Sequence, residues 1–173
     1  RVAMRDIWGF GNYKVSTNAV TPGVSAWSPQ SFTLTPGSNS ITVGWEIPYW
    51  DGGSPVRGYR LQYATSWSGT WTNYSDSLLS GGPITITGLT NGTKYYVRVQ
   101  AVTDVGNGAY STNGKMYPVI PVSAPGVVGS TPVASYSGSN VNLSWTAPSD
   151  NGGSSVTNYL IEYSSDNGST WST

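Results

Sequence analysis

Residues 41–63 read ITVGWEIPYWDGGSPVRGYRLQY, and this stretch decides the fold because the chain contains a second version of it. A shift of one hundred residues places it on residues 141–163, VNLSWTAPSDNGGSSVTNYLIEY, without a gap and with Trp45 on Trp145. A shift of ninety-seven residues places the beginning of the chain on residues 98–110. Similarity that recurs at a nearly constant spacing indicates tandem modules of about one hundred residues.

Each repeat alternates apolar and polar residues with a period of two, which is typical of strands with one buried face. Residues 41–45, 59–63, 84–87 and 95–101 all show this alternation. Turn sequences rich in glycine and asparagine separate them, at 51–53, 81–83, 91–92 and 106–108. No segment has a sustained helical period, so we expect no helix. About seven short strands in each hundred residues predict a sandwich of two sheets.

The middle repeat also carries a longer pattern of aromatic, proline and glycine residues. The pattern runs Trp45, Pro48, Gly52-Gly53, Tyr59, Leu61, Tyr63, Leu89, Thr93, Tyr95 and Gly106-x-Gly108. It resembles the fibronectin type III family over roughly residues 26–121. The resemblance implies an all-β fold of tandem immunoglobulin-like (fibronectin type III) β-sandwiches without disulfides. It also implies that Trp45 fills the core, and that Tyr95 forms a tyrosine corner whose hydroxyl bonds back near Leu89.

The same resemblance divides the chain into three units. Residues 1–23 carry the C-terminal strands, F and G, of a partial module. Residues 24–121 form a complete module, and residues 122–173 carry the N-terminal strands, A to C′, of a further partial module. Partial modules expose strand edges and half of a hydrophobic face. We therefore expect an excerpt from a longer array or, as the alternative, neighbouring copies that complete one another and build a filament.

The composition limits the chemistry that the chain can perform. It has no cysteine or histidine, eight basic and eight acidic residues, and only 9% charged residues. These totals exclude thiolate or histidine catalysis and a basic field for nucleic acid. Glu46 and Glu162 occupy polar positions of alternating strands, while Asp51, Asp150 and Asp166 lie in turns. We therefore expect no enzyme activity, no catalytic residue, no cofactor, no metal site and no membrane span.

Aromatic residues outside the core are the remaining candidates for contact with a ligand or partner. The candidates lie in loops or beyond strand ends: Trp8, Tyr49, Trp50 and Trp67. Such side chains can stack on sugar rings or anchor a protein contact. The alternative is that they pack against a neighbouring module or cover an edge of their own sheet. Trp71 and Trp171 recur at the same place in two repeats, which favours packing for that pair.

These observations predict a non-catalytic, extracellular structural or adhesive array on a bacterial surface, in an extracellular filament or on a phage virion. The Asn-Gly-Thr form of the turn at residues 91–93 resembles bacterial and phage members of the family. The expected partners are neighbouring modules or copies of the chain, with a cell-surface glycan or protein as a further candidate. The alternative function is that of accessory spacer or carbohydrate-binding modules in a secreted polysaccharide-degrading enzyme.

Overall fold

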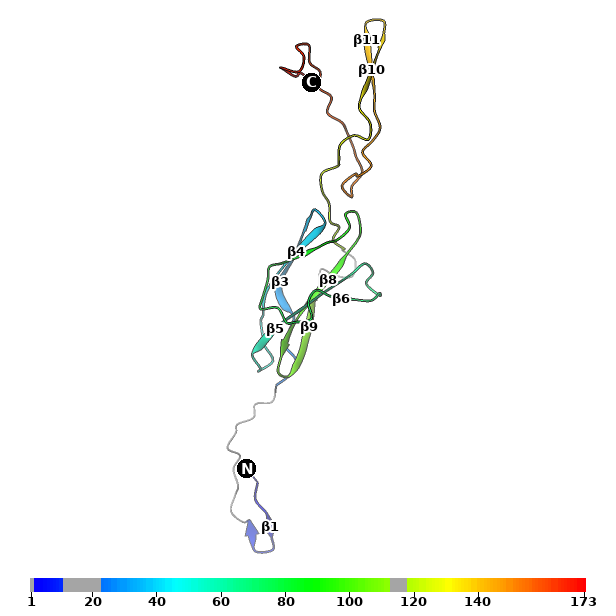
Figure 1. Cartoon of the computed structure of the whole chain (residues 1–173). Helices are drawn as coiled ribbons and strands as arrows, with labels where there is room; N and C mark the ends of the chain where they lie inside the picture. The colour runs from blue at the N-terminus through cyan, green and yellow to red at the C-terminus, as the bar shows by residue number, and fades with distance from the viewer. Residues whose placement is uncertain (1, 11–22, 113–117) are drawn as a thin grey trace.

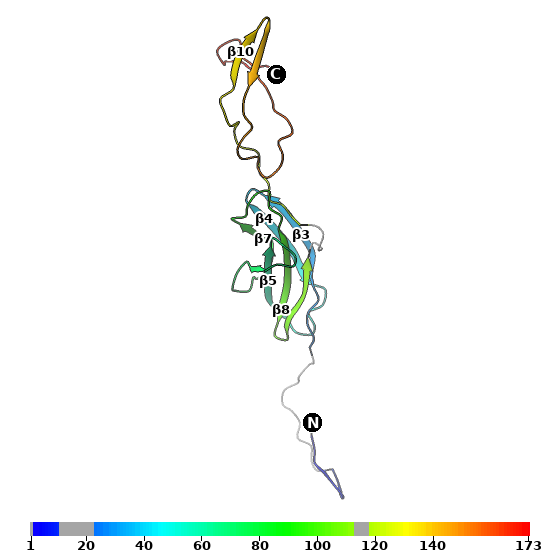
Figure 2. The same cartoon turned by 90° about the vertical axis from the view of Figure 1, so that its right-hand side faces the viewer.

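The computed structural model describes residues 2–10, 23–112 and 118–173. Within these ranges the regular structure consists of antiparallel strands without a helix, so no helix there has the length and apolar character to cross a membrane. The central part is a β-sandwich, and the C-terminal part follows it end to end (Figures 1 and 2).

Seven strands in two sheets form the sandwich. One sheet has the order β3-β4-β7, with β3 at Pro29–Gly37, β4 at Ser40–Pro48 and β7 at Ile84–Thr87. The other has the order β6-β5-β8-β9: β6 is Thr72–Asn73, β5 is Val56–Ala64, β8 is Tyr96–Thr103 and β9 is Gly106–Thr112. This arrangement confirms the predicted all-β sandwich.

The apolar side of each alternating stretch forms the core between the sheets. Ile41, Val43, Val97 and Val99 are fully buried, and Trp45 is 7% exposed. The hydroxyl of Tyr95 accepts a hydrogen bond from the backbone N–H of Thr90 at 3.1 Å, one residue beyond Leu89. The predicted tyrosine corner is therefore present.

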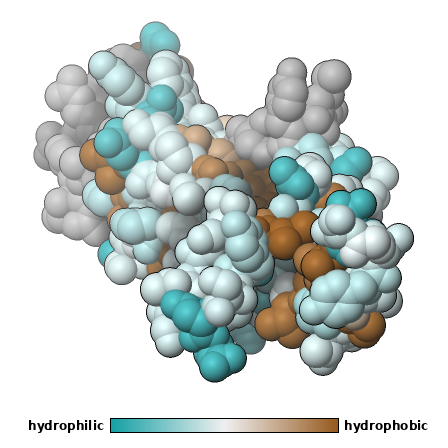
Figure 3. Space-filling model, turned by 90° about the horizontal axis from the view of Figure 1, so that it is seen from above, coloured by the Kyte–Doolittle hydropathy of each residue, from teal (hydrophilic) through white to brown (hydrophobic). Residues whose placement is uncertain are grey.

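Two smaller hairpins flank the sandwich in the sequence. β1 (Arg5–Asp6) pairs with β2 (Gly9–Phe10), and β10 (Val133–Ser137) pairs with β11 (Asn140–Ser144). The β10–β11 hairpin repeats the β3–β4 pair, but its residues are exposed because no other described strand forms a second sheet over them. Residues 159–163, which repeat part of β5, form only an isolated bridge between Tyr163 and Ser172. Hydrophobic residues are visible at this end of the molecule (Figure 3).

Candidate functional site

A stack of aromatic and cationic side chains covers the outer face of the four-stranded sheet. The guanidinium of Arg98 on β8 lies 3.9 Å from the ring centroid of Trp71 and 4.2 Å from that of Tyr110. Trp67 extends the stack, because its ring meets Trp71 edge-on at 5.5 Å and Tyr96 at 6.1 Å. A cation held against two aromatic faces is attracted by both rings.

Hydrogen bonds to a side chain of the neighbouring strand hold this stack in place. Gln62 of β5 accepts a bond from Nε of Arg98 at 2.8 Å and from the hydroxyl of Tyr110 at 3.0 Å. The amide of Gln62 donates to Asn73 of β6 at 2.8 Å. The half-buried Trp67 thus packs against its own sheet, as does Trp71. This geometry favours the packing alternative for both tryptophans.

Replacing Trp71 with alanine is expected to lower the free energy of unfolding of the sandwich by about 1–2 kcal/mol, because one cation–π contact and one aromatic pair are lost. Urea unfolding measures the change. The matched control is Trp171→Ala, which removes the residue at the repeated position in the C-terminal part. An equal loss in both variants would contradict a stabilising role for the stack.

The other predicted contact residues lie apart from this stack. Tyr49 and Trp50 follow β4 and are 87% and 45% exposed. Trp50 is not isolated, since its ring meets Trp27 edge-on at 5.9 Å and its carbonyl accepts the N–H of Trp27 at 3.0 Å. Trp8 lies between β1 and β2 and is 90% exposed. The four candidates therefore do not converge on one site, and only Tyr49 and Trp50 are neighbours.

The aspartates predicted to lie in turns have hydrogen-bond partners, and Asp104, which follows β8, has an ion-pair partner. Asp51 accepts the N–H of Gly53 at 2.8 Å. Hydrogen bonds from Thr170, and then from Ser164, lower the pKa of Asp166 to about 2. Asp104 instead pairs with Arg57 at 2.6 Å on the surface. In the described ranges no three acidic side chains cluster as metal ligands would.

A hydrogen-bonded junction joins the sandwich to the segment that follows it. The N–H of Gly92 donates to the carbonyl of Pro121 at 3.0 Å, and the amide of Asn91 donates to the hydroxyl of Ser123 at 3.1 Å. The N–H of Ser123 donates in turn to the carbonyl of Gly152 at 2.8 Å. The turn at residues 91–92, the segment at residues 121–123 and the turn at residues 152–153 are therefore connected in series.

Glycines allow the two turns of this junction to touch. Gly153 has a φ of 84°, and a side chain there would collide with the backbone nitrogen of Gly92. Gly92 has a φ of 78°, and its added Cβ would lie 3.1 Å from Cα of Gly153. Only glycine combines a positive φ with such a close backbone approach. The glycine pair at residues 152–153 is therefore required by the close contact at the junction as well as by the conformation of the turn.

The hydrogen bond to the carbonyl of Gly152 has a counterpart at the other end of the sandwich. Gly52 has a φ of 80°, and its carbonyl accepts the N–H of Val24 at 2.9 Å, as Gly152 accepts that of Ser123. A side chain at Gly52 would collide with the carbonyl oxygen of Val24, and one at Gly152 with that of Ser123. In both repeats the glycine turn therefore holds the segment that precedes the first strand, at Val24 and at Ser123.

The chain is similar in sequence to a known domain family and to several known proteins. A family model described as the Fibronectin type III domain matches residues 27–116, 90 of the 173 residues. Mouse cardiac-type myosin-binding protein C is 33% identical over 135 residues, covering 78% of this chain and 10% of that protein. Human myomesin-2 is 26% identical over 137 residues, covering 78% and 9% respectively. This chain thus spans about a tenth of the length of these curated relatives.

A solved structure supports the fold. The solution structure of a fourth FNIII domain of a human protein aligns with a TM-score of 0.51 and 19% sequence identity. The alignment covers 68% of this chain and 96% of that domain. At this level of identity the likeness concerns the fold alone.

The relatives contradict the predicted biological setting. We expected an extracellular array on a bacterial surface, in an extracellular filament or on a phage virion, with accessory modules of a secreted enzyme as the alternative. These relatives instead come from vertebrates. The name of the mouse protein refers to myosin binding, and that of a chicken M-protein refers to striated muscle. The predicted function, the predicted bacterial-surface and virion setting, and the predicted extracellular localisation are therefore wrong.

Two local features led to that error, and neither carries information about the source of the chain. The turn at residues 91–93 contains Asn-Gly because Gly92 adopts a positive φ, which any member with this turn requires. The absence of cysteine reflects a core held by packing, with the rings of Trp45 and Tyr59 5.5 Å apart. Such packing stabilises a sandwich in any compartment.

Proposed function

Since this chain belongs to the fibronectin type III domain family, we propose that it is a non-catalytic structural segment of a filament-associated protein. Its modules are held in line by hydrogen-bonded junctions, and their exposed faces bind neighbouring proteins. In this proposal, residues 24–121 are a complete module between parts of two others, at residues 1–23 and 122–173.

The junction between the sandwich and the following segment is the observation that carries the proposal. A flexible linker would leave the two turns apart, whereas Asn91 and Gly92 bond to the linker and lie against Gly153. Each hydrogen bond contributes about 1 kcal/mol, and several in series oppose bending more than one does alone. A chain of such junctions transmits position and load along its length, which is the property that a structural spacer needs.

The relatives suggest the class of partner. Myosin-binding protein C is named for binding myosin, so we propose a protein filament as the partner of the exposed faces. Trp8 and Tyr49, the most exposed of the predicted aromatic candidates, are the contact residues that we assign to this role. Cosedimentation of the chain with myosin filaments tests the partner class, and a chain that stays in the supernatant at every concentration contradicts it.

A spectroscopic distance measurement tests the fixed junction. The chain has no cysteine, so spin labels attach only at introduced positions. Thr87 on β7 and Thr157 beyond the junction are both exposed and suit the substitutions Thr87→Cys and Thr157→Cys. We expect a single narrow distance distribution between the labels. Adding Gly153→Ala is expected to broaden it, because the new methyl group displaces the turn at Gly92.

The matched control separates the junction from backbone strain. Gly168 has a φ of 85°, close to the 84° of Gly153, but its added Cβ would meet only the ring of Trp171, at 3.7 Å. Gly168→Ala therefore introduces the same strain without touching the junction, and we expect it to leave the distribution narrow. A broad distribution in the unsubstituted double-cysteine chain would refute the fixed junction.

A further inference from the structure

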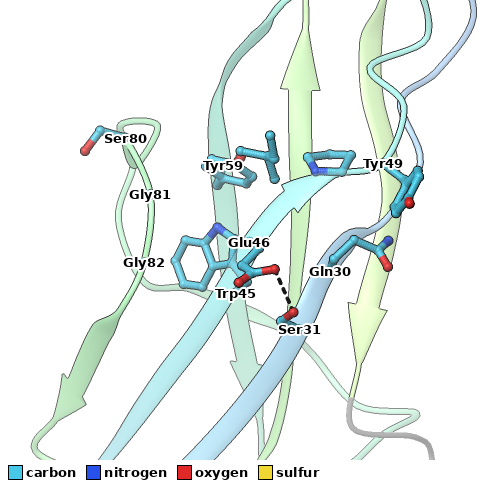
Figure 4. Close-up of a pocket in the computed structure, with 11 residues that line it drawn as sticks. Gln30, Ser31, Trp45, Glu46, Tyr49, Tyr59, Ser80, Gly81 and Gly82 are labelled. Carbon is cyan, nitrogen blue, oxygen red and sulfur yellow. Dashed lines mark hydrogen bonds between the residues drawn. The ribbon is translucent and has the colours of Figure 1, made fainter.

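A groove opens beside Trp45, between the end of β4 and the turn that leads into β7 (Figure 4). Its volume is about 790 Å³. Residues of β3, β4 and β5 contribute to its walls, and residues 80–82 close one side. A second hollow of about 470 Å³ shares the residues 47–49 with it and continues toward Trp50. The two hollows therefore share the end of β4 as a common wall.

One buried polar group in the wall of this groove has no partner among the described residues. Trp45 is 7% exposed, and its Nε1 is buried with no hydrogen-bond acceptor in the described part of the chain. A buried donor left without an acceptor costs about 1–3 kcal/mol. The unpartnered indole N–H is therefore a local cost to the stability of the core beside the groove.

The edge of β4 is free along the same groove. β7 pairs with β4 only from Ser40 to Val43, and its register ends at Ile84. Beyond that point residues 44–48 pair with β3 on one side and with no described strand on the other. An extended peptide can add to such an edge through backbone hydrogen bonds. The gap in the three-stranded sheet is thus suited to one more strand.

Glycines keep the groove open. An added Cβ at Gly81 would meet nothing within 4 Å, so space remains in front of this turn. An added Cβ at Gly82 would lie 2.9 Å from the ring of Trp45, so the turn crosses the indole closely without a side chain of its own. A larger residue at Gly81 would extend into this open space.

The charge of the groove favours a basic occupant. Glu46 contributes the only charged side chain among the residues that line the main groove. Its carboxylate accepts a single side-chain hydrogen bond, from the hydroxyl of Ser31 at 2.8 Å, and it remains exposed. A lysine or arginine beside this carboxylate would gain from charge complementarity, whereas an acidic residue would be repelled.

We propose that this groove binds an extended, basic segment of a partner protein, which adds as a strand to the free edge of β4. The backbone of that segment pairs with residues 44–47, and its lysine or arginine lies beside Glu46. The site does not depend on the spacer role of the junction, which lies at residues 91–92 and 121–123.

Peptide titration followed by NMR tests the proposal on the whole chain. The probe is a capped pentapeptide of alternating valine and lysine, and its counterpart carries glutamate in place of lysine. We expect the lysine peptide to move the backbone amide signals of residues 44–47, which lie along the free edge of β4, and the glutamate peptide to leave them in place. Glu46→Gln is expected to weaken binding of the lysine peptide by up to about fivefold, as for the loss of one exposed ion pair.

A blocking variant tests the location. Gly81 lies in open space and has no positive φ, so Gly81→Leu narrows the groove without strain and is expected to weaken binding by about tenfold. The matched control is Ser77→Leu, which adds a similar side chain at an exposed position of the same connection outside the groove. Before the titration, the NMR signals of core residues in both variants are compared with those of the unsubstituted chain and must be unchanged.

Several results would overturn the proposal. Amide signals of residues 44–47 that are unmoved by the lysine peptide would do so, as would equal binding to Gly81→Leu and to the unsubstituted chain. Binding of cellohexaose, but not of the peptide, at the same residues would assign the groove to a sugar instead. The spin-label distances report on the junction alone. A failure of peptide binding therefore leaves the spacer proposal intact, and a flexible junction leaves the peptide proposal intact.

Discussion

Replacing Trp45 with alanine is expected to lower the free energy of unfolding of the sandwich by about 3–5 kcal/mol, because a buried tryptophan is exchanged for a cavity. Trp45 is 7% exposed, and its ring lies 5.5 Å from that of Tyr59 across the space between the two sheets. A domain of this size has roughly 5–15 kcal/mol of stability in total. The variant is therefore expected to be unfolded in part at room temperature.

Urea unfolding followed by the NMR signals of the Val97 and Val99 methyl groups measures this change within the sandwich. Trp27→Ala is the matched control, since Trp27 is 55% exposed and lies at the surface beside Trp50. We expect the control to lose about 1 kcal/mol or less, the contribution of one aromatic pair. Equal losses in the two variants would show that Trp45 is not the central residue of the core.

Replacing Gly52 with alanine is expected to lower the free energy of unfolding of the sandwich by about 2–4 kcal/mol, because two penalties combine. The first is the positive φ of 80°, which a residue with a Cβ adopts only under strain. The second is a collision between the new methyl group and the carbonyl oxygen of Val24, which opens the hydrogen bond between these residues.

Gly88→Ala isolates the first penalty. Gly88 has a φ of 73°, and an added Cβ there would meet nothing within 4 Å. We therefore expect this control to lose only the strain energy, about 1 kcal/mol. Thermal and urea unfolding measure both variants. If Gly52→Ala were no less stable than Gly88→Ala, the contact between Gly52 and Val24 would contribute nothing to stability.

The local pattern of the sequence predicted the strands and much of the core. Alternation at residues 41–45 and 95–101 placed Ile41, Val43, Val97 and Val99 on the buried side, where the structure has them. It did not predict that residues 159–163 would remain without a sheet. Their counterpart in β5 pairs with β8, and no described segment pairs with residues 159–163 as β8 pairs with β5.

The candidate contact residues were predicted with less success, because a loop position does not determine what a side chain touches. Trp67 and Tyr49 both follow strands in the sequence, yet Trp67 packs against Trp71 while Tyr49 is 87% exposed. The difference arises from Arg98, which comes from a distant strand and offers its guanidinium to the ring of Trp71. No signal near Trp67 in the sequence indicates that contact.

The amino-acid sequence by itself determined the family, the two-sheet sandwich and the residues of its core, because a period of two and the turn glycines act over a few residues. Only the tertiary structure decided which polar groups remain unpartnered and which surfaces meet. The stack of Trp71, Arg98 and Tyr110 and the free edge of β4 both depend on strand register. Register brings together residues that are far apart in the chain, so local patterns carry no record of it.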